Sequence, residues 1–99
     1  MDGGTRVVFH PEAVAEARAA YTWYGQHSEV AAQAFVAELD RAVARMIESP
    51  STWPSYLRQT RRCLFERFPF FLVYRQRAEE LRILAVAHAM RRPGYWKNR

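Results

Sequence analysis

Apolar residues recur along the chain with two different periods. Between residues 11 and 50 they return every three or four positions, which is the period of one helical face. Between residues 63 and 87 they fill three short β-prone runs, and a further β-prone stretch, Thr5–Phe9, precedes the helical part. The pattern therefore predicts one strand, two helices and three strands, in that order.

Both helices are bounded by residues that favour helix ends. Pro11 fits a first helical turn, and Gly25 favours the end of that helix. Ser28 can cap the second helix, which Pro50 stops. The link between the two helices is short, which predicts that they form an antiparallel hairpin and pack their apolar sides on a sheet. We expect the first helix to bury Val14, Ala17, Tyr21 and Tyr24, and the second Ala31, Phe35, Leu39, Ala42 and Met46, flanked by Val36, Val43 and Ile47.

The sheet is expected from the second half of the chain, in the runs Cys63–Phe68, Phe70–Tyr74 and Leu81–Ala87. Short links between them require antiparallel neighbours. The run Phe70–Tyr74 is apolar throughout, so it is either covered on both faces or leaves its outer face to a partner. The predicted fold is α+β: one domain over residues 1–99, with a helical hairpin packed on a small, mainly antiparallel sheet.

Charge divides the chain into two unlike halves. Residues 1–50 hold four arginines and seven acidic residues, a net of −3, whereas residues 51–99 hold eleven basic and three acidic residues, a net of +8. Fourteen of the fifteen basic residues are arginine, which suits bidentate contacts with carboxylates or phosphates. The second half therefore predicts a negatively charged partner, either a phosphate or an acidic polypeptide.

Composition disfavours several classes of protein. Cys63 is the single cysteine, so we expect neither an internal disulfide nor a cysteine-based metal site. No stretch approaches the ~20 apolar residues of a membrane span, and the polar start does not read as a secretory signal. We expect a cytoplasmic protein without metal, cofactor or membrane contact.

The end of the chain gathers basic and aromatic residues in "AVAHAMRRPGYW" (85–96). With the segments that precede it, this ending resembles the RelE/ParE superfamily of toxins from type II toxin–antitoxin modules, and within it the ParE-like branch. The resemblance runs from about Val8 to Arg99 and implies a β-α-α-β-β-β fold in a bacterial protein. Its carriers are "FHPEAVAEARAAYTWY" (9–24), "AFVAELDRAVARMIESPSTWP" (34–54), "RRCLFERFPFFLVYR" (61–75) and "LRILAVAHAMRRPGYWKNR" (81–99).

The resemblance implies a toxin that arrests bacterial growth until a cognate antitoxin covers it. ParE-like members act on DNA gyrase, whereas RelE-like members cut mRNA in the ribosome. Metal-free RNA cleavage needs a base, a cation and an acid, for which the chain offers His88, Arg91 and Tyr95. However, Lys97 is the only lysine, and Phe70–Phe71 stand where a RelE-like enzyme has an arginine. We therefore expect a gyrase inhibitor without catalytic residues; an mRNA endonuclease and a non-toxic binding module stay open as alternatives.

Two sets of residues are expected to bind partners in a toxin–antitoxin hetero-oligomer. Direct binding of nucleic acid stays open, and so do simpler roles: His88 as a turn residue, Tyr95 and Trp96 as core aromatics. The target-binding set is Arg61, Arg62, Arg91, Arg92, Tyr95 and Trp96. The set expected to meet the acidic, initially disordered tail of an antitoxin is Arg62, Arg75, Arg82, Tyr21 and Tyr24.

Overall fold

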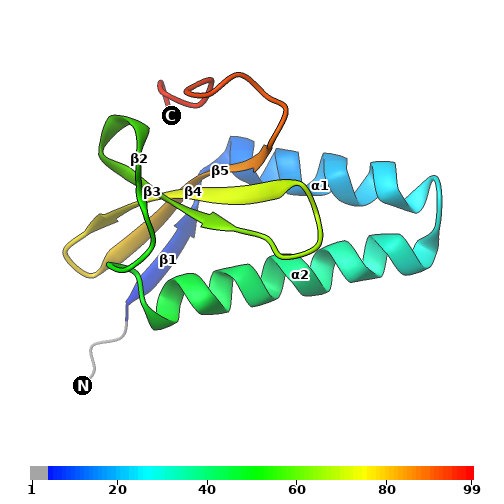
Figure 1. The fold of residues 1–99 in the computed structure, drawn as a ribbon, viewed down its shortest axis with the longest axis horizontal. Helices are drawn as coiled ribbons and strands as arrows, with labels where there is room; N and C mark the ends of the chain where they lie inside the picture. Colours follow the sequence, from blue (N-terminus) through cyan, green and yellow to red (C-terminus); the bar gives the residue numbers. More distant parts are fainter. Residues whose placement is uncertain (1–4) are drawn as a thin grey trace.

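The computed structural model describes residues 5–99, which fold into two helices and one five-stranded sheet (Figure 1). The strand order is β1-β5-β4-β3-β2; β1 runs parallel to β5, and all other neighbours are antiparallel. The α+β class and the order of elements are confirmed. The elements are β1 (Arg6–Phe9), α1 (Pro11–Gly25), α2 (Glu29–Glu48), β2 (Ser55–Tyr56), a 3₁₀ turn (Leu57–Gln59), β3 (Thr60–Leu64), β4 (Phe70–Arg77) and β5 (Glu80–His88).

The sheet differs from the expected one near β3. The two-residue strand β2 was not expected, and it pairs with the start of β3 through Ser55–Arg61 and Tyr56–Thr60. The strand expected at Cys63–Phe68 therefore begins and ends earlier. The prediction of a strand beyond Leu64 is wrong, because the chain turns into β4 from Phe65 onwards. The amide of Phe65 donates to the carbonyl oxygen of Phe70 (3.0 Å) and closes this turn.

The helix ends are confirmed, and the buried helix faces only in part. The Ser28 hydroxyl accepts from the amide of Ala31 (3.2 Å), and α2 ends at Glu48, before Pro50. Tyr21 and Ile47, both expected in the core, are 42% and 44% exposed. On α1 the fully buried positions are instead the small residues Ala13 and Ala20, because small side chains let that helix lie close to β5.

Both faces of the sheet are covered. The helices pack on one face, and residues 89–99, here called the C-terminal segment, lie on the other, which we call the helix-free face (Figure 1). The run Phe70–Tyr74 is buried throughout, which confirms a central strand covered on both sides. The helix-side core includes Phe35, Met46, Cys63, Leu72, Tyr74, Leu81 and Ile83, whereas the core of the helix-free face consists of Phe71, Val73, Leu84, Ala85, Ala87 and Trp96.

The turn between β2 and β3 is held in an unusual backbone conformation. The amide of Thr60 donates to the carbonyl oxygen of Leu57, and the two central residues, Arg58 and Gln59, have φ of 59° and 61°. Positive φ at both central positions is the geometry of a type I′ turn, in which Asn-Gly is the preferred pair. For residues with a full side chain this region costs roughly 1–2 kcal/mol each.

Changing Arg58→Asn together with Gln59→Gly is expected to stabilise the protein by about 1–2 kcal/mol, because both new residues tolerate positive φ. For a domain of this size each kcal/mol corresponds to a rise of about 4–8 °C in melting temperature. Thermal and urea unfolding of this double variant and of Gln59→Gly alone measure the effect, and the single variant should gain about half. A double variant that melts at or below the wild-type temperature would show that the turn is not strained.

Candidate functional site: the arginine face and the C-terminal segment

The C-terminal segment is fastened to the sheet by Trp96. Its side chain is 1% exposed and packs on the helix-free face, with its ring centroid 5.9 Å from that of Tyr56. While the segment stays in place, a target cannot reach this indole. The exposed side chains of the segment include Met90, Arg91, Arg92 and Lys97.

A charged cluster closes the open part of the β5 edge. The parallel strand β1 accompanies β5 only as far as Ile83. Beyond that point the Glu16 carboxylate accepts from the amide of Val86 (3.0 Å), and Arg99 donates to the carbonyl oxygen of Leu84 (3.1 Å). Arg99 also forms an ion pair with Glu16 (3.0 Å). Side chains thus bond to edge groups that a further strand would otherwise occupy.

Tyr95 belongs to the same cluster. Its hydroxyl donates to the second carboxylate oxygen of Glu16 (2.8 Å), and the guanidinium carbon of Arg91 lies 3.9 Å from the ring centroid. Burial, and then the hydrogen bond to Glu16, raise the pKa of Tyr95 above its ordinary value of 10.0. The phenol therefore keeps its proton at neutral pH and directs it towards Glu16.

His88 and Arg91 lie together, whereas the hydroxyl of Tyr95 is hydrogen-bonded to Glu16. His88 and Arg91 line a hollow of about 220 Å³ beside α1, and the Nδ1 atom of His88 accepts from the amide of Met90 (3.0 Å). Of the trio considered for RNA cleavage, the base and the cation are thus adjacent, but the acid is hydrogen-bonded to Glu16.

Stability is expected to fall as the pH rises above about 10. Burial raises the pKa of Tyr74 to about 12, and the pKa of Tyr95 is also raised. Above pH 10 the unfolded chain loses these protons while the folded chain keeps them, so each tyrosine lowers the free energy of unfolding by about 1.4 kcal/mol per pH unit. Urea unfolding between pH 8 and about pH 11 measures this slope. Tyr95→Phe should make it shallower, and an unchanged slope in that variant would contradict the assignment.

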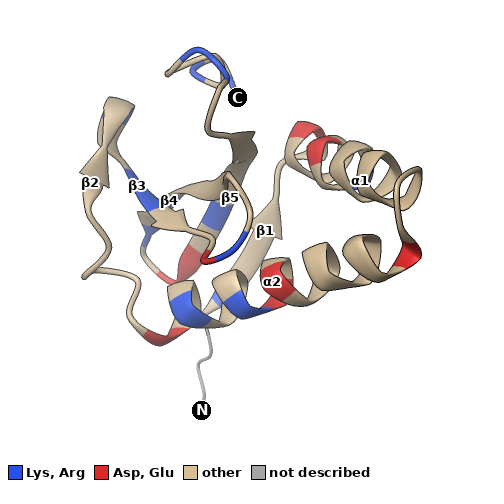
Figure 2. Ribbon diagram, turned by 45° about the vertical axis from the view of Figure 1, so that its right-hand side comes forward, with Lys and Arg blue, Asp and Glu red and all other residues tan. Residues whose placement is uncertain are grey.

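Arginines crowd the other end of the helix-free face, here called the arginine face (Arg6, Arg75, Arg77 and Arg82). Arg75 and Arg82 lie directly opposite each other on β4 and β5, and with Arg77 and Glu80 they line a hollow of about 310 Å³. Figure 2 shows basic residues along β3, β5 and the C-terminal segment.

The ion pairs of the arginine face are formed by Glu80. Glu80 pairs with Arg6 (2.8 Å) and with Arg82 (3.0 Å), and these two hydrogen bonds lower the pKa of its carboxyl group. Arg75 instead donates to the carbonyl oxygen of Arg58 (3.0 Å), and its buried Nε atom has no hydrogen-bond partner. Like charges directly opposite each other destabilise a sheet, so the face favours an anionic ligand.

Arg61 and Arg62, two members of the expected target-binding set, do not form an exposed pair. Both are half-buried, and strand alternation points them to opposite faces. Arg61 donates to the carbonyl oxygen of Trp53 (2.6 Å), and the guanidinium carbon of Arg62 lies 4.5 Å from the ring centroid of Tyr56. Each arginine therefore has a packing role.

The residues expected to bind an antitoxin lie in two places. Arg62, Arg75 and Arg82 share the helix-free face, whereas Tyr21 and Tyr24 lie on the last turns of α1, at the opposite end of the molecule (Figure 1). Tyr24 packs in the helix-side core, and Tyr21 is exposed. The apolar run of β4, whose outer face the sequence left open to a partner as one of two alternatives, is buried.

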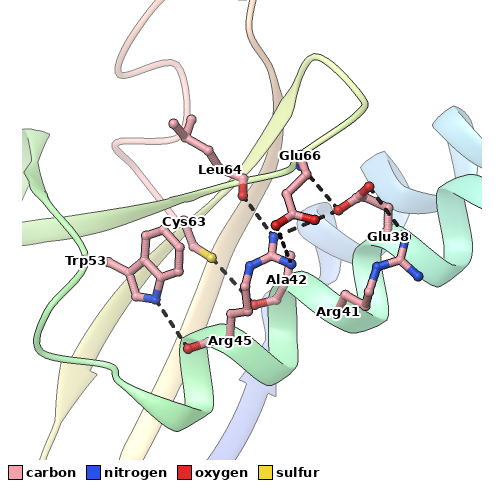
Figure 3. Close-up of polar contacts among 8 residues, drawn as sticks. All are labelled: Glu38, Arg41, Ala42, Arg45, Trp53, Cys63, Leu64 and Glu66. Carbon is pink, nitrogen blue, oxygen red and sulfur yellow. Dashed lines mark hydrogen bonds and ion pairs between the residues drawn. The ribbon is translucent and has the colours of Figure 1, made fainter.

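A buried acid on α2 was missed by the sequence interpretation. Glu38 is 0% exposed, accepts from the amide of Glu66 (3.2 Å) and lies 3.6 and 3.9 Å from Arg41 and Arg45 (Figure 3). Arg45 in turn donates to the carbonyl oxygen of Leu64 (3.1 Å), at the edge of β3. This network ties the β3–β4 turn to α2. Its signal was the spacing, since position 38 is three residues after Phe35 on the buried side of α2.

The buried thiol of Cys63 is expected to be unreactive. Burial raises the pKa of this thiol to about 11, and the sulfur contacts the carbonyl oxygen of Ala42 at 3.5 Å. Within residues 5–99, no group of three or more histidine, cysteine, aspartate or glutamate side chains is placed to hold a metal ion. Over the same stretch, neither helix has the length and apolar character needed to cross a membrane.

Comparison with known proteins adds to this geometry. A family model described as "ParE toxin of type II toxin-antitoxin system, parDE" matches residues 7–93. The chain is also similar in structure to a chain of the "Chromosomal ParDE TA system from P. aeruginosa", with a TM-score of 0.63 and 19% sequence identity over 85% of this chain and 95% of that one. At this identity the likeness concerns the fold. No curated protein matches the sequence.

Proposed function

Because the chain belongs to the ParE toxin family of type II toxin–antitoxin systems, we propose that it arrests bacterial growth by inhibiting DNA gyrase, and that a cognate antitoxin neutralises it. It acts in the cytoplasm, where its target is found. The observation that carries the choice of gyrase over mRNA is the hydrogen bond from Tyr95 to Glu16. An acid for RNA cleavage must deliver its proton to the leaving oxygen, and this phenol donates to a carboxylate of its own chain.

The purified protein is expected to inhibit supercoiling by gyrase and to leave mRNA on translating ribosomes intact. A supercoiling assay and an in-vitro translation reaction with labelled mRNA measure the two activities side by side. His88→Ala should leave gyrase inhibition unchanged, because His88 bonds only the turn that follows β5. Cuts in mRNA that disappear in His88→Ala and in Tyr95→Phe would instead make this protein a ribosome-dependent endonuclease.

Neutralisation is proposed to depend on the arginine face. Arg75 and Arg82 face each other across β4 and β5, and Glu80 is the acid that pairs with arginines of this face. An acidic tail that folds on this face supplies the missing negative charge, and the area it covers offsets the ordering of the tail. Arginine–carboxylate pairs of this kind give specificity and a fast association rate.

Arg75→Glu with Arg82→Glu is expected to weaken antitoxin binding by about tenfold or more, equivalent to at least ~1.4 kcal/mol. Isothermal calorimetry with the protein encoded by the neighbouring gene measures the affinity. Arg18→Glu, an exposed arginine on α1, changes one charge away from this face and serves as the control. A loss of binding free energy in Arg18→Glu that is half of the loss in the double variant, in proportion to the charge reversed, would mean that only net charge matters. The wild-type protein should also melt higher in the complex, because binding stabilises the folded state.

A further inference from the structure

A second basic hollow lies between the β2–β3 turn and the C-terminal segment. It has a volume of about 470 Å³, and Leu57 and Arg58 of the turn form one wall, while Arg92 and Lys97 belong to the other. The walls are packed on each other, since a Cβ atom on Gly94 would lie 3.8 Å from a methyl carbon of Leu57. The two walls come from segments that are distant in the sequence, so the hollow exists only in the folded chain. We call it the basic hollow.

The charge of the basic hollow is uncompensated. Arg58, Arg92 and Lys97 are all exposed, and no aspartate or glutamate is among the lining residues. Among residues 5–99, no ion pair involves any of the three. The arginine face, by contrast, has Glu80 among its cations. Three gathered cations without a counter-charge attract an anionic partner and raise its association rate.

The partner is selected further by an apolar side chain. Leu57 is 44% exposed at the wall of the basic hollow, and Pro93 and Tyr95 also line it. A phosphate backbone makes no use of an exposed leucine, whereas an acidic polypeptide that carries an apolar side chain uses both the leucine and the cations. The chemistry of the hollow therefore fits an acidic protein segment better than a nucleic acid.

The strained turn gives independent support. Arg58 and Gln59 hold positive φ, although Asn-Gly would adopt the same turn without strain. Backbone strain of this kind concentrates at functional positions. One of the two residues in this strained conformation is Arg58, which lines the basic hollow.

We propose that the basic hollow docks an acidic segment of the protein that this toxin inhibits, with Leu57, Arg58, Arg92 and Lys97 as its contacts. The inference rests on the proposed toxic function, and it names the surface for the target. The sequence-based target-binding set contributes Arg92 and Tyr95 to the lining of this hollow, whereas the side chain of Trp96 is buried between the C-terminal segment and the sheet. The antitoxin contacts proposed above lie on the arginine face. Arg75 of that face donates to the backbone carbonyl oxygen of Arg58, which a side-chain substitution retains, so toxicity and neutralisation should be separable by mutation.

The test uses the double variant Arg58→Asn with Gln59→Gly, which removes the charge and relieves the strain. It should melt several degrees above the wild-type protein and bind antitoxin with an affinity within about twofold. Its half-inhibitory concentration against gyrase should nevertheless rise by about tenfold, and its growth arrest should weaken in parallel. Gln59→Gly alone keeps Arg58 and should inhibit like the wild type. Adding Arg92→Gln and Lys97→Gln to the double variant should raise the half-inhibitory concentration further.

Each result supports or overturns the proposal. A double variant that is as potent as Gln59→Gly would overturn it. Growth arrest that depends on Arg58, without inhibition of gyrase by the wild type, would keep the basic hollow and overturn gyrase as the target. A wild-type protein that leaves growth unchanged would overturn the proposed function and this inference together. If a 20-base-pair DNA duplex binds the free protein, and the double variant weakens that binding tenfold, the occupant is nucleic acid and the proposal fails.

Discussion

Replacing Trp96 by alanine is expected to lower the free energy of unfolding by about 3–5 kcal/mol. The indole is 1% exposed and belongs to the core of the helix-free face, together with Phe71, Val73 and Leu84. Its removal leaves a cavity and exposes this apolar face to water. Since native domains are stable by only about 5–15 kcal/mol, the variant should unfold at a much lower urea concentration.

Trp23→Ala is the matched control for this loss. Trp23 carries the same side chain but is 56% exposed on α1, so its removal should cost less than about 1 kcal/mol. Equal midpoints of urea unfolding for the two variants would show that the C-terminal segment is not part of the core. The same argument makes deletion of residues 91–99 a poor test of target binding, because it removes Trp96 as well as the exposed arginines.

The second large effect is expected for Glu16→Ala, at about 2–4 kcal/mol, somewhat below the cost of breaking a fully buried ion pair. This carboxylate accepts from the amide of Val86 and the hydroxyl of Tyr95 and forms an ion pair with Arg99. Its loss leaves two donors without partners and a half-buried guanidinium without its ion-pair partner. Urea unfolding measures the loss, and Glu12→Ala, an exposed acid on the same helix, should cost less than about 1 kcal/mol.

A double-mutant cycle tests whether the cluster acts as a unit. Glu16→Ala and Arg99→Ala should together cost clearly less than the sum of the two single losses, because residues in one network are coupled by about 0.5–3 kcal/mol. Tyr95→Phe combined with Glu16→Ala should show the same sign. Strictly additive losses in both cycles would mean that Glu16 stabilises α1 alone and does not hold the C-terminal segment.

The elements that the sequence predicted well are those with local signals. Ser28 and Pro50 mark the ends of α2 within a few residues, and the period of apolar positions identifies helices and strands. The strand β2 escaped because it has only two residues, and because its turn carries Arg58–Gln59 in place of the Asn-Gly that signals a hairpin. The turn uses two residues that tolerate positive φ poorly, so the sequence lacks the signal that would have predicted the hairpin.

The partner-binding surfaces were harder to predict because they depend on contacts between distant residues. Tyr95 and Glu16 are 79 positions apart, and no periodicity connects them. An aromatic pair at a chain end suits both a core and an interface, so only the fold could show that Trp96 is buried. Adjacent arginines read as one patch, yet strand alternation points Arg61 and Arg62 to opposite faces.

The pairing of β1 with β5 determines at which stage of synthesis the toxin can complete its fold. Arg6 meets Glu80 across 74 positions, and Trp96, which covers the sheet, follows β5 in the sequence. Synthesis proceeds from the N-terminus, so β1 leaves the ribosome long before its partner, and contacts this distant in sequence form late. We expect an interrupted message to yield a fragment with an open sheet, a substrate for proteases instead of a poison. The sheet is completed only after β5 and Trp96 have been translated.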